Sequence, residues 1–213
     1  MNTLNTTCTF DTRTSTRKRL PSHVRVQQIL DAAQIEFSEH GFTAARTDDI
    51  ASRCGLSKGG LYSHFKSKEE LFEALVCRSL TPPDLSDMPD LSETITVRHL
   101  AEWLVGRFYV FLENPSAIAT FRLLIAESER ASSSLATWRR QVLEPHLHTL
   151  GETLKMKTGA SSAIKSIIAN EPWLVISPIV HIMVSQAIFG NAQDKPLKDY
   201  RQAHIAFLCE LLK

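Results

Sequence analysis

The stretch from residue 45 to residue 64 constrains the fold of this 213-residue chain more than any other. A short amphipathic segment spans about 47–54, Gly55 interrupts it, and a second segment of helical composition runs over about 57–65. Glycine adopts the backbone angles of a tight turn at no steric cost. This order of short helix, glycine turn and second helix predicts a helix-turn-helix.

Capping residues support both short helices. Thr47 is the expected N-cap of the first, and Asp48 and Asp49 place negative charge in its first turn, where the helix dipole favours it. Ser57 is the expected N-cap of the second. Each helix therefore has a local reason to begin where the pattern places it.

Two further helices flank this motif. Apolar residues at helical spacing predict a first helix over about 22–39 that Gly41 ends; they are Val26, Leu30, Ala33 and Phe37. Ser67 and Glu70 have the spacing of a capping box and begin a fourth helix. We expect one N-terminal domain over 22–80, preceded by a disordered basic arm over 1–21.

The two sides of the motif differ in chemistry. The side expected to form a small core carries Ile50, Ala51, Cys54, Leu56, Leu61 and Phe65. The exposed side of the second helix offers hydrogen-bond donors and two bare backbone positions: Ser57, Lys58, Gly59, Gly60, Tyr62, Ser63 and His64. Two glycines in a helix cost about 1 kcal/mol each relative to alanine. The close approach of another backbone, such as that of DNA, accounts for them.

The N-terminal region is basic, although the whole chain has a formal net charge of +1. Between Arg13 and Lys68, ten basic residues stand against five acidic ones, a difference of +5. Such an asymmetry favours a polyanionic partner. The arm around Arg13–Arg19 either enters a DNA minor groove or remains a solvated tail.

These segments resemble the DNA-binding domain of the TetR/AcrR family of bacterial transcriptional regulators over about 24–76. The resemblance rests on several fixed spacings at once: Arg25-Val-Gln-Gln-Ile-Leu-Asp-Ala-Ala, His40-Gly-Phe, Thr47-Asp-Asp-Ile-Ala, Gly55-Leu-Ser-Lys-Gly-Gly-Leu-Tyr-Ser-His-Phe and Lys66-Ser-Lys-Glu-Glu-Leu-Phe. It implies an all-α protein that binds a double-stranded DNA operator. The DNA contacts that it implies, mostly to phosphates, come from Thr47, Ser57, Lys58, Tyr62, His64 and Lys68.

The resemblance also implies that Gly59 and Gly60 lie in the major groove. Two positions depart from the family pattern. Gly60 stands where the family often has threonine or alanine, so one side-chain contact is missing. Arg46 stands where serine or threonine is common, and we expect it to clamp a phosphate.

The rest of the chain is also expected to be helical. Three prolines mark residues 81–92 as a linker. Helices are expected over about 95–112, 115–130, 132–154, 172–190 and 197–212, with a kink or division at Pro145. We expect residues 93–213 to form a second all-α domain for effector binding and dimerisation.

The resemblance implies a pocket in this second domain for a small hydrophobic or amphipathic effector. Aromatic residues that composition places in the core are the candidates for its lining: Trp103, Phe108, Phe111, Phe121 and Trp138. Residues 172–190 are apolar nearly all round, which favours a helical interface between two copies of the chain, with burial inside one copy as the alternative. We expect a homodimeric repressor of a pseudo-palindromic operator, with an activator of the same fold as the alternative.

Other classes of function have weaker support. Four widely spaced cysteines without a CxxC pair favour a reducing cytoplasm. Pro178 and several polar residues within 173–189 disfavour a membrane span. His146 and His148 diverge on a helix, so we expect no metal site there. We also expect no cofactor and no catalytic residues. A small helical enzyme and a protein-binding scaffold are the rivals from other classes.

Overall fold

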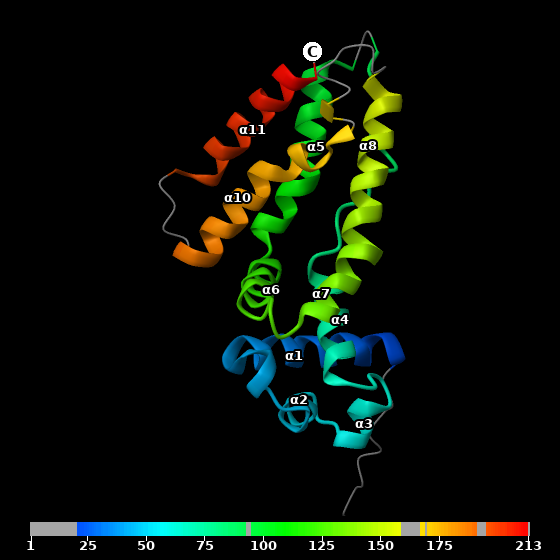
Figure 1. Cartoon of the computed structure of the whole chain (residues 1–213), viewed down its shortest axis with the longest axis vertical. Helices are drawn as coiled ribbons and strands as arrows, with labels where there is room; N and C mark the ends of the chain where they lie inside the picture. The colour runs from blue at the N-terminus through cyan, green and yellow to red at the C-terminus, as the bar shows by residue number, and fades with distance from the viewer. Residues whose placement is uncertain (1–20, 93–94, 159–166, 169, 191–194, 213) are drawn as a thin grey trace, which may run out of the picture.

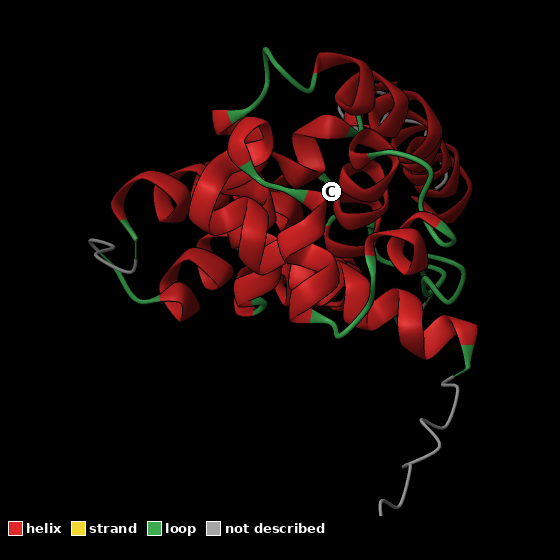
Figure 2. Ribbon diagram, turned by 90° about the horizontal axis from the view of Figure 1, so that it is seen from below, coloured by secondary structure: helices red, strands yellow, loops and turns green. Residues whose placement is uncertain are grey.

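The computed structural model describes residues 21–92, 95–158, 167–168, 170–190 and 195–212. This part of the chain consists of helices joined by turns and loops and contains no strand (Figure 2). The expected basic arm lies outside the described residues except for Pro21. The all-α prediction is confirmed.

Four N-terminal helices form one end of the molecule (Figure 1). They are α1 (Ser22–Ala44), α2 (Thr47–Arg53), α3 (Lys58–Tyr62) and α4 (Lys68–Ser79). Helix α1 packs against both α2 and α4. At its centre Phe37, Phe42 and Phe72 are buried with ring centroids 5.0–5.8 Å apart, and they join the last turns of α1 to α4.

The ends of these helices differ from the prediction in three places. Gly41, with φ of 74°, interrupts α1 as expected, but a helical turn resumes beyond it and reaches Ala44. Thr47 is the first residue of α2 rather than its cap, because Arg46 takes the extended conformation of the N-cap and makes no side-chain capping bond. Helix α3 ends at Tyr62 and not near Phe65, which a turn still connects to the helix.

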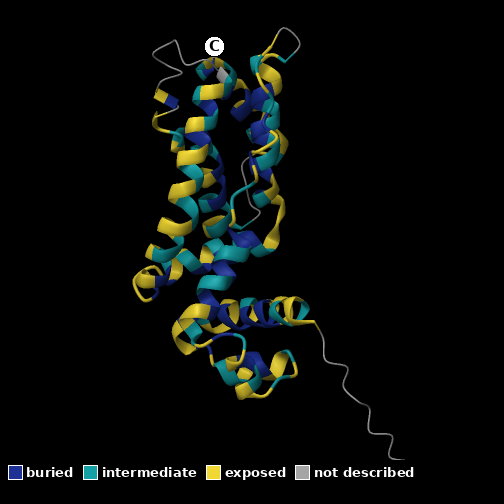
Figure 3. Ribbon diagram, turned by 90° about the vertical axis from the view of Figure 1, so that its right-hand side faces the viewer, coloured by how far each residue is buried: buried dark blue, intermediate teal, exposed yellow. Residues whose placement is uncertain are grey.

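The C-terminal helices form an elongated bundle on the far side of α1 (Figures 1 and 3). They are α5 (Val97–Glu113), α6 (Pro115–Ala126), α7 (Ser132–Trp138), the π-helical segment η1 (Arg139–Leu143), α8 (Glu144–Thr158), α10 (Trp173–Phe189) and α11 (Leu197–Leu211). Helix α5 lies at the centre and packs against α6, α10 and α11. The bounds of α5, α10 and α11 agree to within two residues with the ranges predicted from the sequence.

Pro145 distorts the helical stretch that contains it but does not divide it. Helices α7 and α8 are continuous through η1, which ends two residues before this proline. Proline has no N–H to donate to the carbonyl four residues earlier, so the regular ladder cannot run through it. The predicted distortion therefore takes the form of a π turn rather than a division of the helix.

Residues 81–92 contain no helix, but they are not a loose tether. Leu85 and Met88 are buried, with exposed fractions of 5% and 3%. The segment thus packs on the bundle. A second connection joins α1 to α6, where Gln34 Oε1 accepts a hydrogen bond of 2.6 Å from Thr120 Oγ1.

Candidate functional site

The outer side of α2 and α3 carries most of the residues predicted to contact DNA. On the inner side Ile50, Ala51, Leu61 and Phe65 are buried, and Cys54 and Leu56 are partly buried against the same core. The predicted small core is therefore confirmed. Because α3 has only five residues, this core fixes which of its side chains face outward.

The turn and the cap between the two helices are those that the sequence predicts. Gly55 has φ of 65°, in the region that favours glycine. Ser57 Oγ accepts a hydrogen bond from the Gly60 N–H at 3.1 Å and caps α3. These two residues set the angle at which α3 leaves α2.

Thr47 and Tyr62 lie together on the outer surface. Thr47 Oγ1 and the Tyr62 hydroxyl are 3.3 Å apart, which joins the first residue of α2 to the last residue of α3. Tyr62 is 39% exposed although the neighbouring Leu61 is completely buried. The hydroxyl pair thus faces solvent from a position held by the core beneath it.

Lys58 forms an ion pair across the same surface. Its Nζ lies 3.1 Å from Asp48 Oδ1, and 60% of the lysine side chain is exposed. An exposed pair of this kind contributes little to stability. The pair holds the lysine ammonium group above α2. Breaking it so that the lysine binds a DNA phosphate instead would cost little free energy.

The two glycines of α3 are not required by the packing of the chain itself. A Cβ atom on Gly59 would meet no heavy atom within 4 Å. On Gly60 it would contact Ser57 Oγ at 3.4 Å and Leu56 at 3.5 Å, which is ordinary packing. Alanine would therefore fit at either position within the described chain.

Lys68 has a structural role that the sequence did not reveal. Its Nζ donates to the carbonyls of Thr43 and Ala45 at 3.0 and 3.2 Å and lies 4.8 Å from the centroid of the Phe42 ring. Two of its three N–H donors thus stabilise the end of α1. These contacts offset the unfavourable place of a cation in the first turn of α4.

The remaining expected contacts surround these residues. Arg46 is exposed at the start of α2, and His64 is half-buried beyond α3.

The predicted capping box at α4 is present only in part. Ser67 Oγ accepts from the Glu70 N–H at 3.0 Å, but the Glu70 carboxylate returns to the N–H of Lys66 at 2.6 Å instead of to Ser67.

An ion-pair cluster that sequence reasoning missed fastens α2 to α1. The buried carboxylate of Glu36 lies 3.1 Å from Arg53 Nε and 3.2 Å from His40 Nδ1, and Arg53 also pairs with Glu39. The ligand atoms of Glu36, Glu39 and His40 are close enough together to hold a metal ion. Since Arg53 engages both carboxylates, we interpret the cluster as a brace for the helix-turn-helix.

An apolar pocket of about 270 Å³ lies within the C-terminal bundle. Four of the five aromatic residues predicted for an effector site line it, namely Phe108, Phe111, Phe121 and Trp138. Trp103 does not line it and instead stacks with the Arg107 guanidinium, 4.9 Å from its ring centroid. The rest of the lining consists of Leu80, Pro82, Leu143, His146, Ile176, Ile179, Val180 and Met183.

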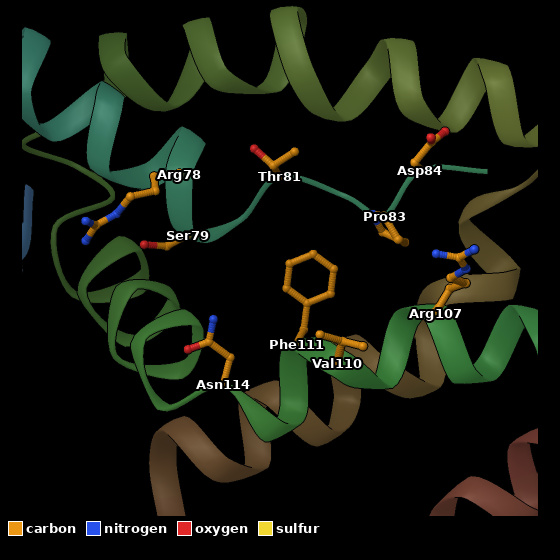
Figure 4. A pocket seen from close by; sticks show the side chains of 9 residues that line it. All are labelled: Arg78, Ser79, Thr81, Pro83, Asp84, Arg107, Val110, Phe111 and Asn114. Atoms are coloured by element: carbon orange, nitrogen blue, oxygen red, sulfur yellow. The ribbon is translucent and has the colours of Figure 1, made fainter. Parts of the chain in front are cut away.

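A polar cavity of about 330 Å³ adjoins this pocket, and Phe111 lines both (Figure 4). Arg78 and Arg107 lie at its opposite ends, with Phe111 between them (Figure 4). Both arginines are paired: Arg78 Nη1 lies 2.7 Å from Asp31 Oδ1, and Arg107 bonds to Asp87. The charge of this cavity is therefore largely compensated.

Helices α10 and α11 expose large apolar side chains. The exposed fractions are 50% for Trp173, 41% for Val180, 64% for Ile188 and 65% for Phe189, and Phe207 on α11 is 42% exposed. The large apolar side chains of α11 are thus only partly inward: Ile205 and Leu208 are buried, but Phe207 is not. Within the described ranges, no helix combines the length and apolar character needed to cross a bilayer.

The comparisons with known proteins agree with this geometry. The family described as "Bacterial regulatory proteins, tetR family" matches residues 29–75. The HTH-type transcriptional activator FasR of Mycolicibacterium smegmatis is 27% identical over 179 residues, which cover 84% of this chain and 78% of that protein. The HTH-type transcriptional regulator UidR of Escherichia coli is 47% identical over 49 residues, covering 23% of this chain and 25% of UidR.

A solved structure extends the likeness in fold to the whole molecule. MexZ, described as a key repressor responsible for antibiotic resistance in Pseudomonas aeruginosa, superposes with a TM-score of 0.62 at 22% identity, covering 89% of this chain and 96% of MexZ. The N-terminal match supplies the family and the superposition supplies the fold. TetR-family proteins are regulators and not enzymes. The chain is a DNA-binding transcriptional regulator of the TetR family.

Proposed function

We propose that this protein is a homodimeric repressor that leaves its operator when a small apolar molecule occupies the pocket of the C-terminal bundle. One observation carries the DNA-binding half of the proposal. The buried core under α3 turns Lys58 and Tyr62 outward, at the end of the molecule farthest from the bundle (Figure 1). A bacterial repressor meets its operator in the cytoplasm, which is where we place this protein.

The proposed DNA contacts have three kinds of role. Lys58 supplies charge and reads base edges, and Tyr62 and Thr47 position the phosphate backbone. Gly59 and Gly60 let the major groove approach the helix backbone. The full proposed set is Arg46, Thr47, Ser57, Lys58, Gly59, Gly60, Tyr62, His64 and Lys68.

The exposed apolar face of α10 and α11 supports a second copy of the chain as its partner. Large apolar side chains on these two helices are 41–65% exposed, and a partner pair of helices would remove them from water. Two copies that pair these helices would bury the face in a four-helix interface with twofold symmetry. Residues 22–80 would then form the DNA-binding domain of each copy and residues 93–213 the effector-binding and dimerisation domain.

The position of the pocket supports control of DNA binding by a ligand. Leu80 and Pro82, which line it, directly follow α4, and Phe121 lies on α6, which packs against α1. A ligand that moves these residues shifts the helices that carry the DNA-binding surface. To empty a nearly full operator, the ligand must prefer the released state by roughly 10⁴-fold, about 5.5 kcal/mol.

A transcriptional activator is the second candidate, because FasR, which matches 84% of this chain, is named as one. Both candidates bind DNA in the same way. A reporter gene placed behind the selected operator separates them. Deletion of the regulator raises its output for a repressor and lowers it for an activator.

Selection from a random pool of DNA duplexes tests the binding proposal. We expect enrichment of an inverted repeat whose half-sites are one helical turn apart, about 34–36 Å. Lys58→Ala and Tyr62→Ala should each weaken binding to this repeat at least tenfold, about 1.4 kcal/mol, with unchanged helix content and dimerisation. Lys155→Ala, on α8, is the matched control and should bind normally. Unchanged affinity of both variants at moderate salt would refute the assignment of α3.

A further inference from the structure

The wall of the apolar pocket offers almost no group that could form a hydrogen bond with a ligand. Its accessible surface is almost entirely nonpolar. Trp138 and His146 are the described lining residues with polar side-chain atoms, but Trp138 Nε1 and His146 Nε2 are both buried. A ligand in this pocket therefore meets carbon and sulfur rather than hydrogen-bond donors and acceptors.

Charged side chains lie in the neighbouring cavity instead. Arg78, Arg107 and Asp84 line that polar cavity (Figure 4). Among the described residues that line the apolar pocket, none is lysine, arginine, aspartate or glutamate. Burial also lowers the pKa of His146, so its imidazole is neutral at neutral pH. A ligand carboxylate or ammonium group would lose its hydration in this pocket with no opposite charge to replace it.

The side chains of the wall favour an aromatic ligand. Five of the lining residues carry aromatic rings. Two of them, Phe108 and His146, pack edge-on with ring centroids 6.0 Å apart. An aromatic ligand can form the same kind of contact with these rings. The thioether of Met183, which also lines the pocket, packs favourably against aromatic rings as well.

The volume sets the size of the ligand. An engineered cavity of about 150 Å³ holds one benzene molecule. The present pocket, at about 270 Å³, has nearly twice that volume. It therefore accommodates about ten non-hydrogen atoms on the same scale. The aromatic lining favours a flat ring system within that limit.

Resting on the proposed function, we propose that the ligand of this pocket is an uncharged aromatic hydrocarbon of about ten non-hydrogen atoms without a hydrogen-bonding group. Alkylbenzenes are the simplest members of this class. Volume and shape set the affinity of such a ligand, because the wall has almost no polar surface to hold it in one orientation. Each hydroxyl added to the ligand would lose hydration without gaining a partner. The pocket therefore selects against polar analogues of the same size.

Three benzene probes test this selection with the full chain and no DNA. p-Xylene, p-cresol and hydroquinone have the same number of non-hydrogen atoms, and hydroxyl groups replace one methyl group of p-xylene in p-cresol and both in hydroquinone. The two hydroxyls of hydroquinone lie at opposite ends of the ring, so at least one enters the pocket in either orientation. We expect isothermal titration at neutral pH to show p-xylene binding at least about tenfold more tightly than hydroquinone, with p-cresol between them.

A substitution in the wall then locates the bound probe. Met183→Gln keeps the length of the side chain but places an amide in the wall, where it can bond to the hydroxyl of p-cresol. It should weaken the binding of p-xylene about tenfold and reduce the advantage of p-xylene over p-cresol. Met156→Gln is the matched control, because Met156 on α8 is 72% exposed and lies outside the pocket. It should bind all three probes as the wild type does.

A second variant separates polarity from shape. Met183→Leu changes the shape of the wall but keeps it nonpolar, so the order of the three probes should be that of the wild type. Circular dichroism establishes that each variant is folded before titration. The order of the probes with the wild-type chain tests the proposal even if Met183→Gln does not fold.

The outcomes separate this proposal from the wider function. Equal or tighter binding of p-cresol or hydroquinone, or no binding of p-xylene, would overturn the hydrocarbon proposal. A folded Met183→Gln variant with the affinities of the wild type would also overturn it, because the probes would then bind outside the pocket. Each of these results would leave operator binding intact.

A gel shift with the operator and saturating p-xylene tests the proposed function separately. We expect p-xylene to release the operator. Binding of p-xylene without release would overturn control by this pocket but leave its preference for hydrocarbons in place. Loss of operator enrichment would likewise overturn the proposed function alone.

Discussion

The molecule contains two aromatic clusters with opposite characters. In the N-terminal helices Phe37, Phe42 and Phe72 pack with centroids no more than 5.8 Å apart and fill their space. In the C-terminal bundle a similar set of rings surrounds a pocket of about 270 Å³. Protein interiors are normally packed without voids of this size. The filled cluster therefore holds the outer surface of α2 and α3 in place, while the hollow one borders the pocket that we propose for a ligand.

The largest expected effect tests this contrast through stability. Phe72→Ala should lower the free energy of unfolding by about 3–5 kcal/mol, because a filled core cannot collapse around the lost ring. Phe121→Ala should lower it by about 1.5 kcal/mol or less, because that half-buried ring already borders a void. Urea denaturation at one fixed protein concentration measures both. Equal losses would show that the two clusters are packed alike.

The N-terminal helices could be predicted from the sequence in more detail than the C-terminal pocket. In the N-terminal helices the signals are local: Gly55 makes the turn, and Ser57 caps the helix two residues later. Helical periodicity then separates the buried Leu61 from the exposed Tyr62. The ion pairs of Arg53 with α1 escaped prediction because their partners lie more than ten residues away in the sequence.

The pocket could be predicted only in outline. Aromatic composition indicated four of its residues, but Ile176 and Met183 come from α10, and no local signal brings that helix to α7. Trp103, also on α5, does not line this pocket, because helical periodicity alone does not say which neighbouring helix each side of α5 meets. His146 was considered only as a metal ligand. In the structure it lines the pocket from the first turn of α8, a placement that no local signal in the sequence indicated.

A smaller effect separates the outer surface of α3 from the packing beneath it. Gly59→Ala should weaken operator binding about tenfold, about 1.4 kcal/mol, because the added methyl group projects into open space where DNA approaches. The same change should raise the free energy of unfolding by about 0.5–1 kcal/mol, since alanine favours a helix. Gel shifts and urea denaturation measure the two effects.

Gly106→Ala, on α5, is the matched control for this glycine substitution. Its methyl group would contact Arg201 Nη2 at 3.4 Å in the C-terminal bundle, so it gains helix stability away from the proposed DNA-binding surface. We expect near-normal operator affinity. If both variants lost affinity equally, the loss would come from a general effect of the added methyl group and not from the approach of a DNA backbone.

The smallest expected effect is a loss of stability at mildly acidic pH, and it should appear in the C-terminal bundle. His204 Nε2 donates a hydrogen bond of 2.9 Å to the Val175 carbonyl, which leaves the buried Nδ1 unprotonated and without a partner in the described chain. Burial lowers the pKa of His204 more than this hydrogen bond raises it, and burial also lowers the pKa of His146. Tyr109 beside His204 stays neutral, because burial raises its pKa to about 12.

The sign of the pH dependence follows from these directions. The unfolded chain binds protons at both histidines near pH 6.5, whereas the folded chain resists protonation until a lower pH. Stability is therefore complete above about pH 6.5 and falls as the pH drops below it. His204→Gln keeps an N–H for Val175 but cannot titrate, so its acid-induced loss should be smaller than that of the wild type. The exposed His148→Gln should retain the full loss. Hydrogen exchange at mildly acidic pH should then show α11 opening before α4, and the reverse order would place the acid-sensitive core at the DNA-binding end.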